Sequence, residues 1–160
     1  MPWTTPKTWA DNELVTAALM NAQLRDNLEY LKARTGGVVY RGPNGGGLST
    51  NATSYVTVPG FSITKTIKTG QVLVLFNGTF TLYTSVSATG KVSLHIDGVD
   101  TKEILSLTAS SNTNRAAYGA LLLTGISDGS HVFDLRWKQS GGTAINLIDD
   151  PLISFVVLEV

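Results

Sequence analysis

The stretch HVFDLRWK at residues 131–138 has the clearest pattern in the chain. Its apolar residues, Phe133, Leu135 and Trp137, alternate with charged ones. Successive side chains of a β-strand point to opposite faces, so this alternation predicts a strand with one face in a core and one in water. Turn sequences rich in glycine and serine flank the stretch on both sides, as expected at the ends of a strand.

Similar short strands are predicted along the rest of the C-terminal region. Residues 71–84 are apolar at both odd and even positions, which predicts a strand buried on both faces near the centre of a sheet. The last strand, 153–160, has the same character and suits a sheet centre or a subunit interface. The remaining candidates are 54–58, 62–67, 91–97, 99–107, 116–125 and 144–148. Strands at roughly ten-residue spacing without intervening helices predict a mainly β fold, an antiparallel sandwich for which we favour a jelly roll.

Composition excludes several classes of function. The 160 residues include no cysteine, 12 Lys+Arg and 12 Asp+Glu, so the formal net charge is zero. No basic face or tail is evident, and we therefore expect no nucleic-acid partner. The N-terminal sequence lacks the apolar segment of a secretory signal, and no run approaches the ~18 apolar residues of a membrane span. We expect no association with a membrane. We also expect that the protein assembles in a cytoplasm.

The N-terminal region differs from the rest of the chain. Pro2 and Pro6 favour an extended arm, and Trp3 and Trp9 lie in it with little local sequence able to bury them. Two indoles left in water are unfavourable, so we interpret these tryptophans as anchors that dock into a neighbouring molecule. The alternative is a disordered arm.

A helix is predicted over residues 17–34, with Thr16 as its N-cap and glycines at its end. The residues on one face of this helix are separated alternately by four and three positions, as in a coiled-coil seam. This face consists of Ala17, Asn21, Leu24, Leu28 and Leu31. We expect it to mediate self-association or docking on a partner; the alternative is packing on the chain's own β-domain. The predicted organisation is thus an anchoring arm and helix at 1–36, a Gly-rich connector at 37–47 and a β-domain at 48–160.

The sequence contains no pattern typical of catalysis. Of the two histidines, His131 shares the parity of the apolar residues in its strand and is expected at a core edge or interface, whereas His95 is expected to face solvent. Asp97 is explained by a hairpin turn at Asp97-Gly98. Calcium binding at Asp149-Asp150 is an open alternative to a turn, although the EF-hand spacing is absent. We predict no enzyme activity, no metal site and no cofactor.

A polar loop at 108–114 is a candidate recognition site. Its side chains of interest are Thr108, Ser110, Ser111, Asn112 and Asn114. Hydroxyl and amide groups of this kind suit sugars, which usually also need an exposed aromatic ring for stacking. The tyrosines mostly lie in or beside predicted strands, so the sequence favours this site only weakly.

Three N-terminal segments together resemble the opening of many tailed-bacteriophage virion proteins. They are TPKTW at 5–9, ELVTAA at 13–18 and NAQLRDNL at 21–28. In style, the β-region is similar to the trimeric jelly-roll heads of the tumour-necrosis-factor and complement type. Members of the bacteriophage group include capsid decoration proteins, head fibres, and tail-tip or fibre components.

The resemblance implies a structural protein located in the virion. We expect a homotrimer, a capsid decoration or head-fibre protein, whose arm grips the major capsid protein or another virion protein. The alternative is a tail-fibre or tail-tip module that recognises host-surface glycans through its loops.

Overall fold

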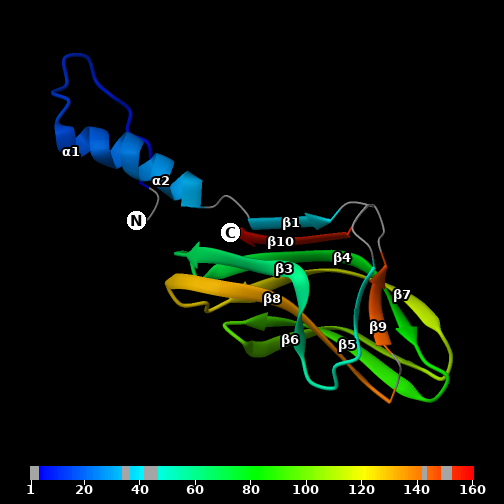
Figure 1. Cartoon of the computed structure of the whole chain (residues 1–160). Coiled ribbons are helices and arrows are strands. Elements are labelled where there is room, and N and C mark those ends of the chain that lie inside the picture. Colours follow the sequence, from blue (N-terminus) through cyan, green and yellow to red (C-terminus); the bar gives the residue numbers. More distant parts are fainter. Residues whose placement is uncertain (1–3, 34–36, 42–46, 142–143, 149–152) are drawn as a thin grey trace.

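The C-terminal region folds into two antiparallel sheets that pack face to face, and the N-terminal helix extends from one end (Figure 1). The computed structural model describes residues 4–33, 37–41, 47–141, 144–148 and 153–160. The helical segment comprises α1 (Ala17–Met20), the π-helical turn η1 (Asn21–Arg25) and α2 (Asp26–Ala33). The strands are β1 (Gly37–Arg41), β2 (Leu48–Thr50), β3 (Val56–Ile67), β4 (Gln71–Tyr83), β5 (Ala88–Ile96), β6 (Val99–Ala109), β7 (Thr113–Thr124), β8 (Gly129–Ser140), β9 (Ala144–Ile148) and β10 (Ile153–Glu159).

Sheet A is organised around β4. Its order in the described part of the chain is β1-β10-β4-β9-β2, with β7 on the other edge of β4. Along one edge, β4 pairs first with β10 and then, beyond Gly78, with β9. Along the other edge it pairs with β7 for nearly its whole length. The predicted central position of this strand is confirmed, as is that of the last strand, β10, which lies between β1 and β4.

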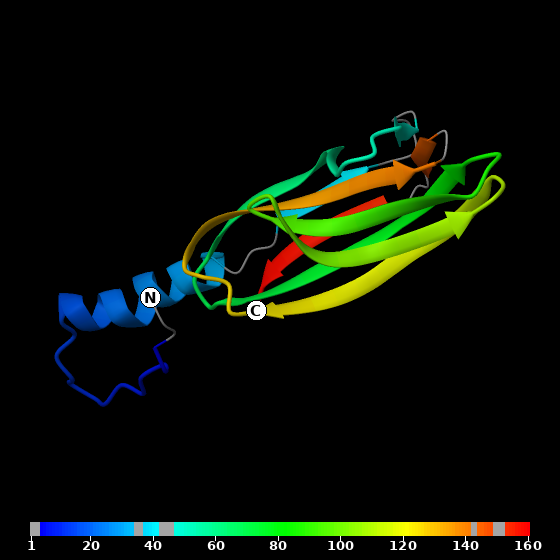
Figure 2. The same ribbon diagram turned by 90° about the horizontal axis from the view of Figure 1, so that it is seen from below.

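Sheet B has the order β3-β8-β5-β6. The HVFDLRWK stretch forms most of β8, and its Phe133, Leu135 and Trp137 are buried as predicted. Trp137 reaches across the sandwich to Phe80 of β4, with the two rings edge to face at 6.4 Å. Together with the two-sheet architecture, this core confirms the predicted mainly β jelly-roll sandwich (Figure 2).

A buried carboxylate fastens the end of β10 to the turn that links the two sheets. Glu159 Oε1 accepts hydrogen bonds from the backbone N–H groups of Lys68 and Thr69, at 2.5 and 2.6 Å. These residues form the turn from β3 to β4, so one side chain satisfies two donors that the turn leaves unpaired.

Two predicted boundaries differ from the structure. Within the predicted connector at 37–47, Gly37–Arg41 forms β1 and pairs with β10; residues 42–46 lie outside the described part. The predicted strands at 54–58 and 62–67 form a single strand, because β3 runs through Pro59 and Gly60 with a shift of register between Thr57 and Ser62. Proline is tolerated there because β3 is an edge strand and the pairing is interrupted at the bulge.

Candidate assembly surfaces

The N-terminal arm turns back sharply before the helix begins. Glu13 N donates to Ala10 O at 3.2 Å, and the Glu13 carboxylate accepts from Ala10 N at 3.1 Å. Asn12 takes a positive φ of 64°, a conformation that asparagine tolerates better than most residues. The predicted N-cap is confirmed, since Thr16 Oγ1 accepts from Leu19 N at 3.2 Å.

Two amide side chains of the helix hold the arm against it. The Asn27 carboxamide accepts from Thr4 N at 2.9 Å and donates to Thr4 O at 3.0 Å. One turn earlier, Gln23 accepts from Lys7 N at 2.7 Å and donates to Thr5 O at 3.3 Å. The amides thus satisfy backbone groups of the arm as a neighbouring strand would, and Asn27 is buried beneath it. The sequence does not reveal this contact, because Gln and Asn four residues apart are common on solvated helix faces.

Of the two predicted anchor residues, only Trp9 lies in the described part of the chain; Trp3 does not. Trp9 is exposed, with Lys7 Nζ 5.3 Å from its ring centroid. Lys7 also forms an ion pair with Glu13. The indole is therefore fixed to the arm by a charged neighbour while part of its apolar surface remains open.

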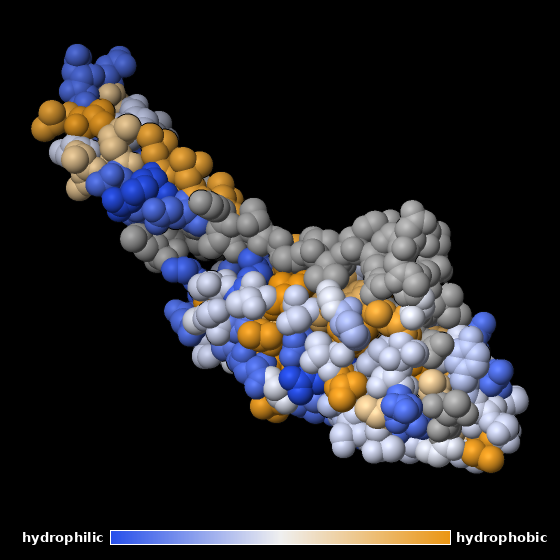
Figure 3. Space-filling view, in the orientation of Figure 1, coloured by the Kyte–Doolittle hydropathy of each residue, from blue (hydrophilic) through white to orange (hydrophobic). Residues whose placement is uncertain are grey.

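Beside the residues that hold the arm, the helix carries an exposed apolar stripe, which we define as Met20, Leu24, Leu28 and Leu31. The three leucines are 51%, 63% and 52% exposed. Figure 3 shows the apolar side chains in a row along one side of the helix. Figures 1 and 2 agree that the helix extends away from the sandwich, so the stripe does not pack on the chain's own sheets.

The predicted helix is confirmed, but its centre is not α-helical. Asn21–Arg25 form a π-helical turn, in which Asp26 N bonds back to Asn21 O. Met20 lies four residues before Leu24 and continues the line of the leucines, as residues four apart do on a helix. Ala17 and Asn21 are exposed.

A second apolar surface covers the outside of sheet A. We define the sheet-A face as Leu73, Leu75, Tyr118, Leu122, Val156 and Leu158. Leu73 of β4 lies between Leu158 of β10 and Leu122 of β7 in the strand register. Tyr118 is 80% exposed and Leu122 61% exposed. The sequence signal for this face was the apolar character of residues 71–84 and 153–160 at both odd and even positions.

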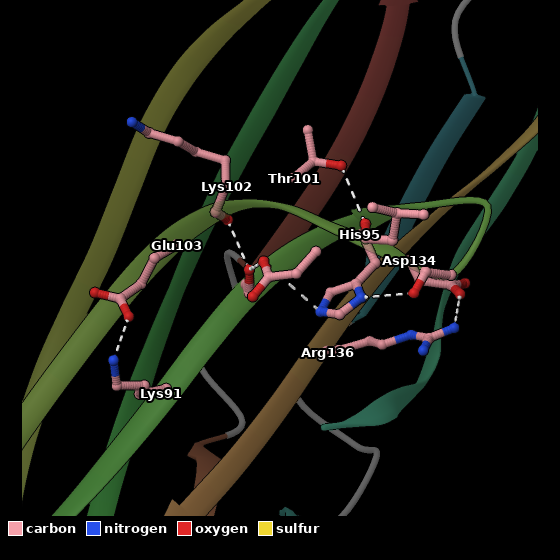
Figure 4. Close-up of polar contacts among 11 residues, drawn as sticks. Lys91, His95, Thr101, Lys102, Glu103, Asp134 and Arg136 are labelled. Carbon is pink, nitrogen blue, oxygen red and sulfur yellow. Dashed lines mark hydrogen bonds and ion pairs between the residues drawn. The ribbon is translucent and has the colours of Figure 1, made fainter. Parts of the chain in front are cut away.

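Polar groups gather instead on the outside of sheet B (Figure 4). His95 was predicted to face solvent, but it is only 4% exposed. The ring of Tyr55, from the segment before β3, meets it edge to face at 5.0 Å, and His95 Nδ1 lies 3.2 Å from Gly98 O. The prediction failed because the alternation along β5 identifies His95 as a residue of the outer face. It does not reveal that Tyr55, from outside the strand, covers that face. Burial, followed by the charge of Asp100, raises the pKa of Tyr55.

The other members of this cluster connect β5 to β6. The Ser93 hydroxyl contacts the Asp100 carboxylate and lies 2.9 Å from Lys102 O. Beside them, Lys91 Nζ donates to Glu103 Oε2 at 2.7 Å. The Glu103 carboxylate raises the pKa of Lys91. Ser93 is fully buried and is engaged by a carboxylate and a backbone carbonyl, so the geometry provides cross-strand ties and not an activated hydroxyl.

Asp97 and His131 close one end of sheet B. Asp97 has a positive φ of 52° in the predicted hairpin turn. Its Oδ1 accepts from Val132 N at 2.9 Å, and its Oδ2 lies 2.7 Å from His131 Nδ1. His131 Nε2 is 2.9 Å from Ser127 O. The hydrogen bonds from Val132 N and His131 lower the pKa of Asp97, while the bonds to Asp97 and the Ser127 carbonyl raise the pKa of His131.

We expect Asp97→Asn to shift the pKa of His131 down toward its ordinary value of 6.5. Asparagine keeps an acceptor for Val132 N but removes the charge. In the wild type, the contribution of His131 to stability is present below 6.5 and is lost as pH rises through its raised folded pKa. The contribution of Asp97 is present above 3.8 and is lost as pH falls through its lowered pKa.

The difference in stability between the wild type and Asp97→Asn should therefore be largest between pH 3.8 and pH 6.5 and should shrink on either side of this range. NMR titration of the His131 ring and thermal unfolding at several pH values measure both effects. An unchanged His131 pKa in the variant would contradict this pairing.

The predicted recognition loop is shorter than expected. Thr108 lies in β6 and Asn114 in β7, so only residues 110–112 connect the strands. Thr108 contacts Thr89 across the sheet at 2.9 Å, and Asn114 accepts from Thr81 at 2.7 Å. Strand pairing engages these two side chains, while Ser110, Ser111 and Asn112 remain exposed.

Within the described ranges, no three His, Asp or Glu side chains gather in a way that could hold a metal ion. Asp149-Asp150, the calcium alternative, fall outside those ranges. No helix in the described part is long and apolar enough to cross a membrane.

The architecture is that of a jelly-roll sandwich, and comparison with solved structures agrees. One chain in the structure of infectious bursal disease virus Gt strain matches with a TM-score of 0.50 and 12% identity, over 78% of this chain and 33% of that one. Eiger TNF from S. frugiperda matches with a TM-score of 0.45 and 11% identity, over 78% of this chain and 91% of its own. The first likeness shows a shared fold, although this chain spans only about a third of the viral one. No family model and no curated protein matches the chain.

Proposed function

We propose that the protein is a structural component of a virion, a homotrimer whose jelly-roll heads are joined to a bundle of N-terminal helices. The observation that carries the proposal is the apolar stripe. Leu24, Leu28 and Leu31 are each more than half exposed on a helix that is otherwise fastened to its own arm. A helix this short is marginal in water and needs tertiary packing, so its apolar side needs a cover.

The sheet-A face supports the same assembly. It lies on the outside of the sandwich, and its most exposed members, Tyr118 and Leu122, are large and uncharged. Contiguous apolar patches on a surface typically mark interaction sites. Three copies that pack through this face and through the helices would cover both surfaces at once.

The viral setting rests on the N-terminal resemblance to tailed-bacteriophage virion proteins. The jelly-roll fold also occurs in a chain of the infectious bursal disease virus structure, which is consistent with a virion component. Within the virion, we assign the protein to the capsid surface as a decoration or head-fibre protein. The arm is the anchor to the major capsid protein or another virion protein.

Trimerisation explains how a short arm suffices as an anchor. One exposed Trp9 with its flanking residues offers a small contact. Three arms on one trimer bind through effective concentration, because each bound arm holds the other two near their sites. The capsid lattice is thereby reinforced by contacts that are individually weak.

Deleting residues 1–12 should abolish binding to particles that lack the protein, while the trimer persists. The deletion removes Trp9 and the arm but keeps the stripe. Co-sedimentation with particles purified from the encoding virus measures binding, and light scattering measures the oligomer.

Trp9→Ala is the milder variant and should weaken co-sedimentation in the same direction. Asp11→Ala, in the exposed turn of the arm, is the matched control and should bind as the wild type does. Full retention of binding by the deletion variant would refute the anchor role.

A further inference from the structure

The end of the sandwich opposite the helix carries an open pocket. β4 ends there at Tyr83, and the loop at 110–112 lies beside it. Figure 2 shows that these strand ends and loops lie at the far end of the sandwich from the helix. The pocket has a volume of about 650 Å³. Its lining residues are Tyr83, Thr84, Ser85, Ser110, Ser111 and Asn112.

The chemistry of the lining is uniform. It consists of one aromatic ring, hydroxyl groups and one carboxamide, with no Asp, Glu, Lys, Arg or His. Tyr83 is 40% exposed, so part of its ring is open to a ligand. An aromatic face beside hydroxyl and amide groups suits a sugar, whose C–H face packs on the ring while its hydroxyls exchange hydrogen bonds. A charged ligand would find no opposite charge among these side chains.

Hydrogen bonds hold both walls of the pocket in place. Asn112 Oδ1 accepts from Thr84 N at 2.9 Å, which ties the loop to the end of β4. Thr84 Oγ1 accepts from Val86 N at 3.1 Å and shapes the turn after β4. Thr113 Oγ1 donates to Ser111 O at 2.9 Å. A pocket formed before the ligand arrives avoids much of the entropy cost of ordering loops on binding.

We propose that this pocket binds a neutral saccharide. The Tyr83 ring stacks on one face of a sugar residue, and Ser110, Ser111 and Asn112 hydrogen-bond to its hydroxyls. The position opposite the helix leaves the pocket open when the helical end is attached to another surface. The site is formed within one chain, so it depends neither on the trimer nor on the virion location.

The test uses the full chain on an array of immobilised neutral and acidic oligosaccharides, the latter carrying sialic or uronic acids. We expect selective binding to neutral glycans. Tyr83→Ala removes the stacking surface and should lower the affinity for the best glycan by about tenfold. Tyr83→Trp should retain binding. The matched control is Val99→Ala, which truncates an exposed side chain of β6 outside both the pocket and the sheet-A face and should leave the affinity unchanged.

A second variant keeps the test decisive if Tyr83→Ala does not fold. Ser111→Glu, in the exposed loop, puts bulk and a negative charge into the pocket and should also reduce binding. The proposal is overturned if the wild type binds no neutral glycan on the array or prefers the acidic ones. It is equally overturned if both pocket variants, shown to be folded by thermal unfolding, bind as the wild type does.

Discussion

Leu28→Glu should convert the proposed trimer to a monomer while the β-domain stays folded. Leu28 is the most exposed leucine of the apolar stripe. Burying one leucine contributes about 2 kcal/mol, and a threefold assembly repeats that contribution in each copy, or about 6 kcal/mol per trimer. Glutamate also places a charge in the bundle, where burial without a partner is costly.

The substitution should weaken association without weakening the helix itself. Arg25 and Lys32 lie three and four residues from position 28, so glutamate there favours the isolated helix. Leu14→Glu is the matched control, because Leu14 is 79% exposed but precedes the helix and is not part of the stripe. Light scattering at micromolar concentration should give a trimer for the control. A Leu28→Glu protein that remains trimeric would remove the stripe from the interface.

Trp137→Ala should cause a large loss of stability in the β-domain. Trp137 is buried in β8 and contacts Phe80 across the sandwich. Truncating a buried tryptophan costs about 3–5 kcal/mol, a large fraction of the 5–15 kcal/mol that typically stabilises a folded domain. We therefore expect Tm to fall by about 10 °C or more.

Thermal unfolding in the Leu28→Glu background measures this loss without a contribution from dissociation. Lys102→Ala, on the exposed surface of β6, is the control and should change stability by less than about 0.5 kcal/mol. A similar Tm for both variants would contradict the central place of β8 in the core.

Local patterns in the sequence predicted which segments form strands. They were less able to predict which distant segments pair with those strands. The alternation in residues 131–138 and the continuous apolar character of 71–84 predicted β8 and the central strand β4, because each pattern reports the faces of a single strand. Strand β1 was missed because it gains its stability by pairing with β10, which lies at the other end of the chain. No periodicity within Gly37–Arg41 reports a partner so distant in sequence.

The candidate surfaces were predicted only in part, for the same physical reason. The leucines of the helix follow from their spacing, but the π-helical turn at Asn21–Arg25 does not. Asn27 and Gln23 bind an arm about twenty residues earlier, a tertiary contact that spacing alone does not reveal. Burial of His95 depends on Tyr55 from another segment in the same way.

The most direct measurement is the mass of the full chain in solution, by light scattering over a range of micromolar concentrations. The exposed stripe and the sheet-A face predict a mass three times that of the 17.0 kDa chain. A mass equal to one chain across the whole range would mean that both apolar surfaces stay in water, which contradicts the proposed assembly.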